Sequence, residues 1–79
     1  MKLWLLLPLN QDKEPFSGYD VALGFVVCAK SEKKARDLAQ KHGGDERRAS
    51  PWRDSRLVSC VELTPEGPEG IVLRDFRAG

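Results

Sequence analysis

The sequence predicts a small α+β domain with the element order β-β-α-β-β, in which a small, mainly antiparallel sheet carries one helix on one face. A nearly unbroken apolar run at residues 22–29 leads into a charged pattern with helical spacing at residues 31–42. Shorter apolar runs lie toward both ends of the chain. Such strand-like runs beside an amphipathic helix favour one sheet with one covering helix. A chain of 79 residues has room for one core, so we expect a single domain over residues 1–79.

The first strand is expected at residues 3–7, an apolar run that Pro8 ends. The run is too short for a signal-peptide core or a membrane span, and no small-residue cleavage site follows it, so a strand is favoured. Residues 9–20 are polar and rich in turn formers, which predicts an irregular surface loop. Phe16 and Tyr19 interrupt this polarity, and each either folds back onto the core or stays exposed for a partner.

The second strand is expected at residues 21–29. It lacks alternating polar residues, so we expect a central strand that is covered on both faces. A helix over residues 31–42 follows, with Ser31 as its N-cap. The helical face that we expect to pack on the sheet has the spacing i, i+3, i+4, i+7 and consists of Ala35, Leu38, Ala39 and His42.

The remaining elements follow the helix. Gly43-Gly44 predicts a left-handed turn that ends it. Residues 43–55 predict a long irregular loop, in which Trp52 is the only large apolar residue. A third strand is expected near residues 56–63, and a fourth at residues 71–76 is expected to pair back as a hairpin.

The charge of the chain is unevenly distributed. Residues 30–56 hold nine Lys/Arg and five Asp/Glu, a net charge of +4, whereas the rest of the chain carries −3. The basic middle favours an anionic partner. The isoelectric point of about 7.8, however, lies below the value of about 9 above which dedicated nucleic-acid-binding domains are found.

The chain offers few residues for catalysis or for metal binding. Cys28 and Cys60 lie in strand-like runs without CxxC spacing, and His42 is the only histidine. A closed zinc site needs four ligands and a nucleophilic cysteine needs a nearby base, so we expect free thiols, no metal, no cofactor and no enzymatic activity. A thiol-dependent enzyme is kept as an alternative. Free cysteines are typical of a reducing cytoplasm, which is the compartment we expect.

The basic loop at residues 45–56 is the candidate binding site. Tryptophan and arginine are enriched at the energetic centres of protein interfaces, so we expect a non-enzymatic protein-binding module with Trp52 as its anchor. The other expected contact residues are Arg47, Arg48, Arg53, Arg56 and Tyr19. The alternative is a single-stranded nucleic-acid or small anionic-ligand binder that uses the same arginines.

Several short motifs of the chain, taken together, resemble those of a known class of proteins. They are Tyr19-Asp20, Phe25-Val26-Val27-x-Ala29-x-Ser31-Glu32, Ala35-Arg36-x-Leu38-Ala39, Gly44-Asp45-Glu46, Trp52-x-Asp54 and Cys60. The set resembles small uncharacterised proteins encoded by phages and mobile elements. The resemblance implies a stand-alone protein of the host cytoplasm that binds and inhibits a host factor, such as a defence protein, and it assigns no site residues. No membrane partner is expected, and a homodimer is an open alternative because so small a sheet leaves unpaired edges.

Overall fold

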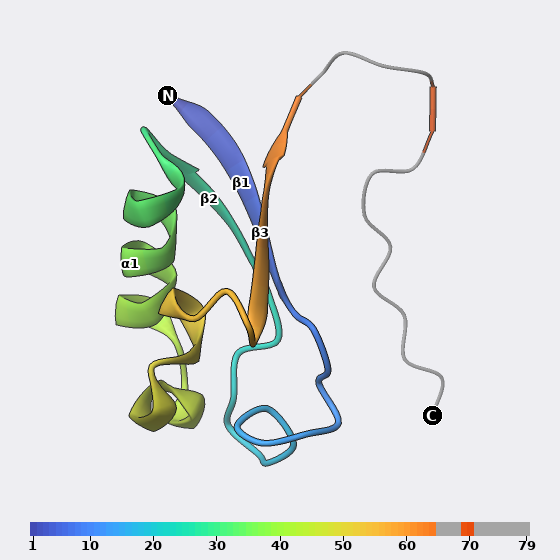
Figure 1. The fold of residues 1–79 in the computed structure, drawn as a ribbon, viewed down its shortest axis with the longest axis vertical. Helices are drawn as coiled ribbons and strands as arrows, with labels where there is room; N and C mark the ends of the chain where they lie inside the picture. The colour runs from blue at the N-terminus through green and yellow to red at the C-terminus, as the bar shows by residue number, and fades with distance from the viewer. Residues whose placement is uncertain (65–68, 71–79) are drawn as a thin grey trace.

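The computed structural model describes residues 1–64 and 69–70. It confirms the predicted α+β class, with one helix packed against a small antiparallel sheet (Figure 1). The predicted fourth strand at residues 71–76 lies outside the described residues. The elements in chain order are β1 (Lys2–Pro8), β2 (Phe25–Ala29), α1 (Glu32–His42), the 3-10 helices η1 (Asp45–Ala49) and η2 (Pro51–Arg53), and β3 (Val58–Leu63).

The described sheet has the strand order β2-β1-β3, with both outer strands antiparallel to β1. The expectation that residues 21–29 form a central strand covered on both faces does not hold in the described sheet, because β2 lies at the edge of its three strands and begins at Phe25. The segment before it bonds elsewhere. The Ala22 amide donates to the Glu46 carboxylate, and the Asp20 carbonyl accepts from the Asp45 amide, so these backbone groups are bonded to η1 instead of to a strand.

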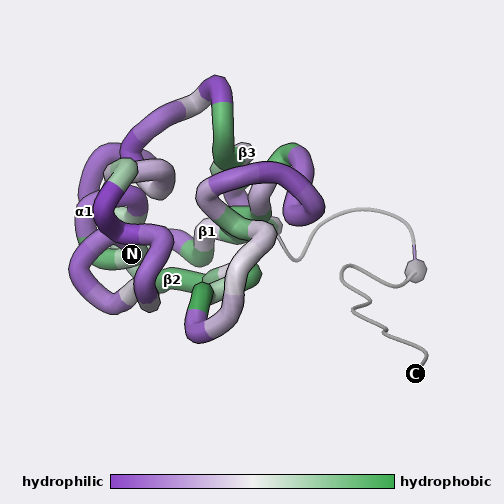
Figure 2. The backbone as a smooth tube through the Cα atoms, turned by 90° about the horizontal axis from the view of Figure 1, so that it is seen from below, coloured by the Kyte–Doolittle hydropathy of each residue, from purple (hydrophilic) through white to green (hydrophobic). Residues whose placement is uncertain are grey.

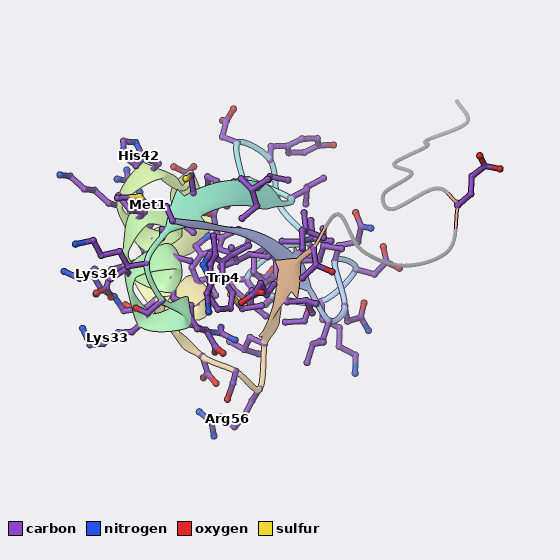
Figure 3. The ribbon with its side chains drawn as sticks, turned by 90° about the horizontal axis from the view of Figure 1, so that it is seen from above. Met1, Trp4, Lys33, Lys34, His42 and Arg56 are labelled. Atoms are coloured by element: carbon purple, nitrogen blue, oxygen red, sulfur yellow. The ribbon has the colours of Figure 1, made fainter. Side chains whose placement is uncertain are left out.

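The core lies between the sheet and α1. Side chains alternate along each strand, and residues directly opposite each other in the register share a face. Trp4 of β1 lies opposite Val27 of β2, and Figure 3 places Trp4 between α1 and the sheet. Figure 2 shows hydrophobic residues along the strands and a mostly hydrophilic α1. The buried core residues are Leu6, Phe16, Ala29, Ala35, Ala39, Trp52 and Val58.

The N-cap of α1 is confirmed, since the Ser31 side chain accepts a hydrogen bond from the Lys34 amide. The buried face of the helix differs from the expected one. Leu38 is 40% exposed and His42 is also exposed, whereas Arg36 and Gln40 are buried beside the two alanines. Figure 3 shows His42 projecting outward.

The buried face turns toward Arg36 and Gln40 because the segment after α1 packs there. Arg36 Nη1 donates to the Trp52 carbonyl at 3.1 Å, and Gln40 Nε2 donates to the Arg47 carbonyl at 3.0 Å. Gln40 Oε1 in turn accepts from the Trp52 amide at 3.3 Å. Two polar side chains of the helix thus satisfy backbone groups of η1 and η2, which a purely apolar stripe does not do.

Gly43 ends α1 in an extended conformation, with φ −72° and ψ 179°, so the expected left-handed stop is wrong. Close approach explains both glycines instead. A Cβ at Gly43 would meet the carboxylate of Glu46, and a Cβ at Gly44 would meet the backbone carbonyl of Asp20. The glycines let the chain pass between α1, η1 and the segment before β2.

Candidate functional site

The structure buries the residue that was expected to anchor a partner. Trp52 has no exposed surface, and its ring lies at 5.3 Å from that of Phe16 and 4.8 Å from that of Phe25, both edge-to-face. Its indole Nε1 donates to Glu46 Oε2 at 3.1 Å. The expectation that Trp52 anchors a partner is therefore corrected, because the residue is the centre of the core. The segment at residues 43–55 is not an irregular loop but a packed pair of 3-10 helices.

The arginines of this segment do not form one basic surface. Arg53 Nε lies 3.0 Å from the carboxylate of Asp37, and Arg56 Nη2 lies 2.9 Å from that of Asp54. The Arg56 side chain, followed by its backbone amide, holds the pKa of Asp54 below its ordinary value of 3.8. Two of the four predicted arginines are therefore paired with acidic neighbours.

Arg47 and Arg48 lie on η1. The guanidinium of Arg47 donates to the carbonyls of Gly44 and Lys41, so it satisfies acceptors at the end of α1. Arg48 is exposed and forms no ion pair with the residues that the structure describes. Tyr19 is 94% exposed and lines one hollow of about 530 Å³ with Arg48. Of the predicted contact residues, the structure thus brings Tyr19 and Arg48 together.

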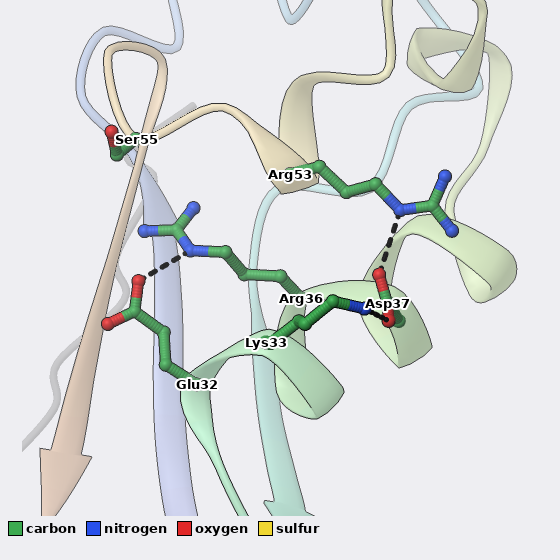
Figure 4. Close-up of a pocket in the computed structure, with 6 residues that line it drawn as sticks. All are labelled: Glu32, Lys33, Arg36, Asp37, Arg53 and Ser55. Atoms are coloured by element: carbon green, nitrogen blue, oxygen red, sulfur yellow. Dashed lines mark hydrogen bonds and ion pairs between the residues drawn. The ribbon is translucent and has the colours of Figure 1, made fainter.

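A groove of about 730 Å³, lined by charged side chains and Ser55, runs between α1 and the segment that leads to β3 (Figure 4). Lys33 and Arg53 both contact Asp37, at 3.1 Å and 3.0 Å, and Lys33 is the main cause of a lowered Asp37 pKa. Arg36 Nε contacts the Glu32 carboxylate at 2.8 Å. The groove thus holds three cations and two acids, a net charge of +1, and because each cation contacts one of these acids it attracts an anionic ligand only weakly.

The thiols lie on opposite faces of the sheet. Burial raises the pKa of the Cys60 thiol, which keeps it protonated at neutral pH and works against a nucleophilic role. Cys28 is exposed. Within residues 1–64 and 69–70, no three His, Cys, Asp or Glu side chains gather closely enough to hold a metal ion.

Among residues 1–64, the exposed apolar side chains of the strands lie on the second face of the sheet. In the register, Leu5 of β1 lies between Val26 of β2 and Val61 of β3, and Leu3 lies between Cys28 and Leu63. Figure 1 shows α1, η1 and η2 on the other side of the sheet. No described helix packs on this second face, which we call the uncovered face, and it consists of Leu3, Leu5, Leu7, Val26, Cys28, Ser59, Val61 and Leu63.

Four of the eight residues of the uncovered face are exposed, the other four are half-buried, and none carries a charge. Val26 is 53% exposed and Val61 is 55% exposed, and Leu3 is exposed to a similar degree. Sequence reasoning missed this surface because an apolar strand without polar alternation is usually covered on both sides. A signal was present nonetheless, since the sequence predicts a single helix, and one helix can cover only one face of a sheet.

Comparison of the chain with protein-family models, with curated proteins and with solved structures finds no match in any of the three. The resemblance to phage-encoded proteins therefore stays a prediction. In the part of the chain that the structure describes, no helix has both the length and the apolar character needed to cross a bilayer.

Proposed function

We propose that the chain is a protein-binding module whose contact surface is the uncovered face of the sheet. The observation that carries this proposal is the exposure of Val26 and Val61, which flank the central Leu5 on a face without charge. Antiparallel sheets that face water usually present polar side chains there. A sheet face that keeps leucine and valine instead is typical of a surface that a partner covers.

The chemistry of the face restricts its partner. Leucine and valine offer apolar area and no hydrogen-bond donors or acceptors, so the matching surface is itself apolar and uncharged. The face is the open side of a three-stranded sheet, so we expect it to bind another sheet or the apolar side of a helix. The resemblance to phage-encoded proteins would make this partner a host protein, bound in the cytoplasm and inhibited by the contact.

The experiment compares lysine substitutions on the two faces of the molecule. The double variant Val26→Lys, Val61→Lys places two charges on the uncovered face at positions that are already half exposed. The control Leu38→Lys places one positive charge on the solvent side of α1, at a leucine that is 40% exposed. A protein captured by the full chain from cells that carry its gene is purified, and its dissociation constant is measured for each variant.

We expect the double variant to weaken binding at least about tenfold, because each lysine must be desolvated in an apolar interface. The Leu38→Lys variant should bind like the parent. Unchanged binding by the double variant would contradict the proposal. A loss of binding in Tyr19→Ala or Arg48→Ala, with the double variant unaffected, would instead place the contact at the hollow beside η1.

A further inference from the structure

We propose that a second copy of this chain occupies the uncovered face, so that two sheets pack face to face in a weak, symmetric dimer. This inference rests on the proposed function, because it uses the same surface, and it adds the identity of one partner. The argument uses the charge of the face, the symmetry of its residues about β1 and its area.

The first argument is charge. All eight residues of the uncovered face are uncharged, and six of them are leucine or valine. A charged or strongly polar partner would leave its own groups desolvated and unpaired against this surface, which costs binding energy. A second uncovered face presents no such group. The chain therefore carries a surface of the required chemistry on every copy of itself.

The second argument is the symmetry of the central row of residues across β1. The row through Leu5 reads Val26, Leu5, Val61, with one valine from each edge strand. Consider a two-fold axis that runs parallel to β1, midway between two facing sheets. It places β1 of one copy over β1 of the other, and β2 of each copy over β3 of the other. Each Val26 then faces a Val61 of the other copy. An interface of this kind is isologous, and the same patch serves both copies.

The third argument is area, which sets the strength of the dimer. Three strands spaced about 4.8 Å apart, each about six residues long, give a footprint of about 15 Å by 20 Å, or about 300 Å² per copy. This is well below the roughly 800 Å² per partner of a standard stable interface. We therefore expect a reversible dimer with a dissociation constant above about 10 µM. Such a dimer would give way to a partner that binds the same face more tightly.

The experiment measures mass and thiol reactivity on the full chain over the same concentration series. Sedimentation equilibrium from about 5 µM to about 1 mM should show the mass rising from 8.9 kDa toward twice that value. Alkylation of Cys28 by iodoacetamide should slow several-fold over this range, because the dimer covers that thiol. Cys60, on the α1 side of the sheet, serves as an internal reference whose rate should not depend on concentration.

The lysine variants assign the dimer to the face. The Val26→Lys, Val61→Lys protein should stay at the monomer mass and keep a fast Cys28 at all concentrations, whereas Leu38→Lys should behave like the parent. If circular dichroism shows that the lysines unfold the protein, the variant Val26→Thr, Val61→Thr keeps the branched shape. It should weaken the dimer at least about threefold, since a hydroxyl replaces a buried methyl group.

Three results would overturn the inference. One is a monomer mass with a fast Cys28 at every concentration, which would leave the face open to a different partner and the proposed function intact. Another is a monomer mass with Cys28 protected at every concentration, which would mean that another part of the same chain covers the face. The third is a dimer that the face variants do not weaken, since its contact would lie elsewhere.

Discussion

The indole Nε1 of Trp52 donates a hydrogen bond of 3.1 Å to Oε2 of Glu46, and both side chains are buried. The other carboxylate oxygen accepts from the Ala22 amide at 2.6 Å and from the Gly44 amide at 2.9 Å. One carboxylate therefore joins the segment before β2, the end of α1 and the core tryptophan. The loop that the sequence presents as a basic surface is built around this carboxylate.

Replacing Glu46 by Gln should destabilise the fold by about 1–3 kcal/mol. Every group that contacts this carboxylate is an N–H donor. The NH₂ group of a glutamine at this position would face one of these donors, and the two donors cannot form a hydrogen bond with each other. Urea unfolding gives the free energy. The control Glu62→Gln, at an exposed ion pair with Lys2, should change it by no more than about 0.5 kcal/mol. Equal effects of the two substitutions would contradict the role assigned to Glu46.

Replacing Trp52 by Phe should lower the free energy of unfolding by about 2–4 kcal/mol, because it leaves a cavity and removes the donor to Glu46. Binding of the captured partner should be unchanged wherever the variant is folded, since the ring has no exposed surface. Denaturant unfolding and the dissociation constant measure the two effects separately. A folded variant with weakened binding would restore Trp52 as a contact residue.

The two perturbed aspartates predict a response to acid. Lys33 and then Arg53 hold the pKa of Asp37 below 3.8, and Arg56 does the same for Asp54. A carboxyl whose folded pKa is lowered adds stability above its unfolded pKa, and this stability is lost as the pH falls through the folded value. The double variant Asp37→Asn, Asp54→Asn should therefore be less stable than the parent at about pH 7, by a difference that is smaller at about pH 3.

Unfolding free energies at the two pH values test this response. The side chains of both aspartates keep contact with solvent, being 39% exposed at Asp37 and 25% exposed at Asp54, so we expect a small effect. A difference between variant and parent that is the same at both pH values would show that the two ion pairs do not produce it.

The two thiols should report the two faces of the sheet. At a protein concentration of about 5 µM, below the expected dissociation constant, Cys28 should be alkylated faster than Cys60 near neutral pH. The reason is that Cys28 is exposed, whereas burial raises the pKa of Cys60. Mass spectrometry of digested samples measures both rates. A faster Cys60 would contradict the assignment of that residue to the covered face.

Much of the fold could be predicted from local patterns. The apolar run before Pro8 gives β1, and Ser31 followed by a charged helical pattern gives the start of α1. The strand order could not be predicted, because an apolar run such as residues 25–29 is compatible with a central strand and with an edge strand of a sheet. The buried side of α1 was missed because Arg36 and Gln40 are buried through hydrogen bonds to Trp52 and Arg47, which only the fold brings near.

The predicted site was less accessible to sequence reasoning. Trp52 and its arginines have the composition of an interface, yet the same residue types also build a core held by ion pairs. Whether these residues form an interface or a core depends on whether acidic side chains lie close to them. Here Glu46 accepts a hydrogen bond from Trp52, and Asp37 forms an ion pair with Arg53. The uncovered face could be predicted only from the number of helices available to cover the sheet, because each of its strands taken alone resembles a buried strand.

Methyl NMR of the chain with its captured partner tests the central claim most directly. With leucine and valine methyl groups labelled, addition of the partner should shift and broaden the signals of Leu5, Val26 and Val61 most strongly. The signals of Leu38, on the far side of α1, should stay in place. Shifts confined to Leu57, which lines the hollow shared by Tyr19 and Arg48, with the methyl groups of the uncovered face unchanged, would contradict the account.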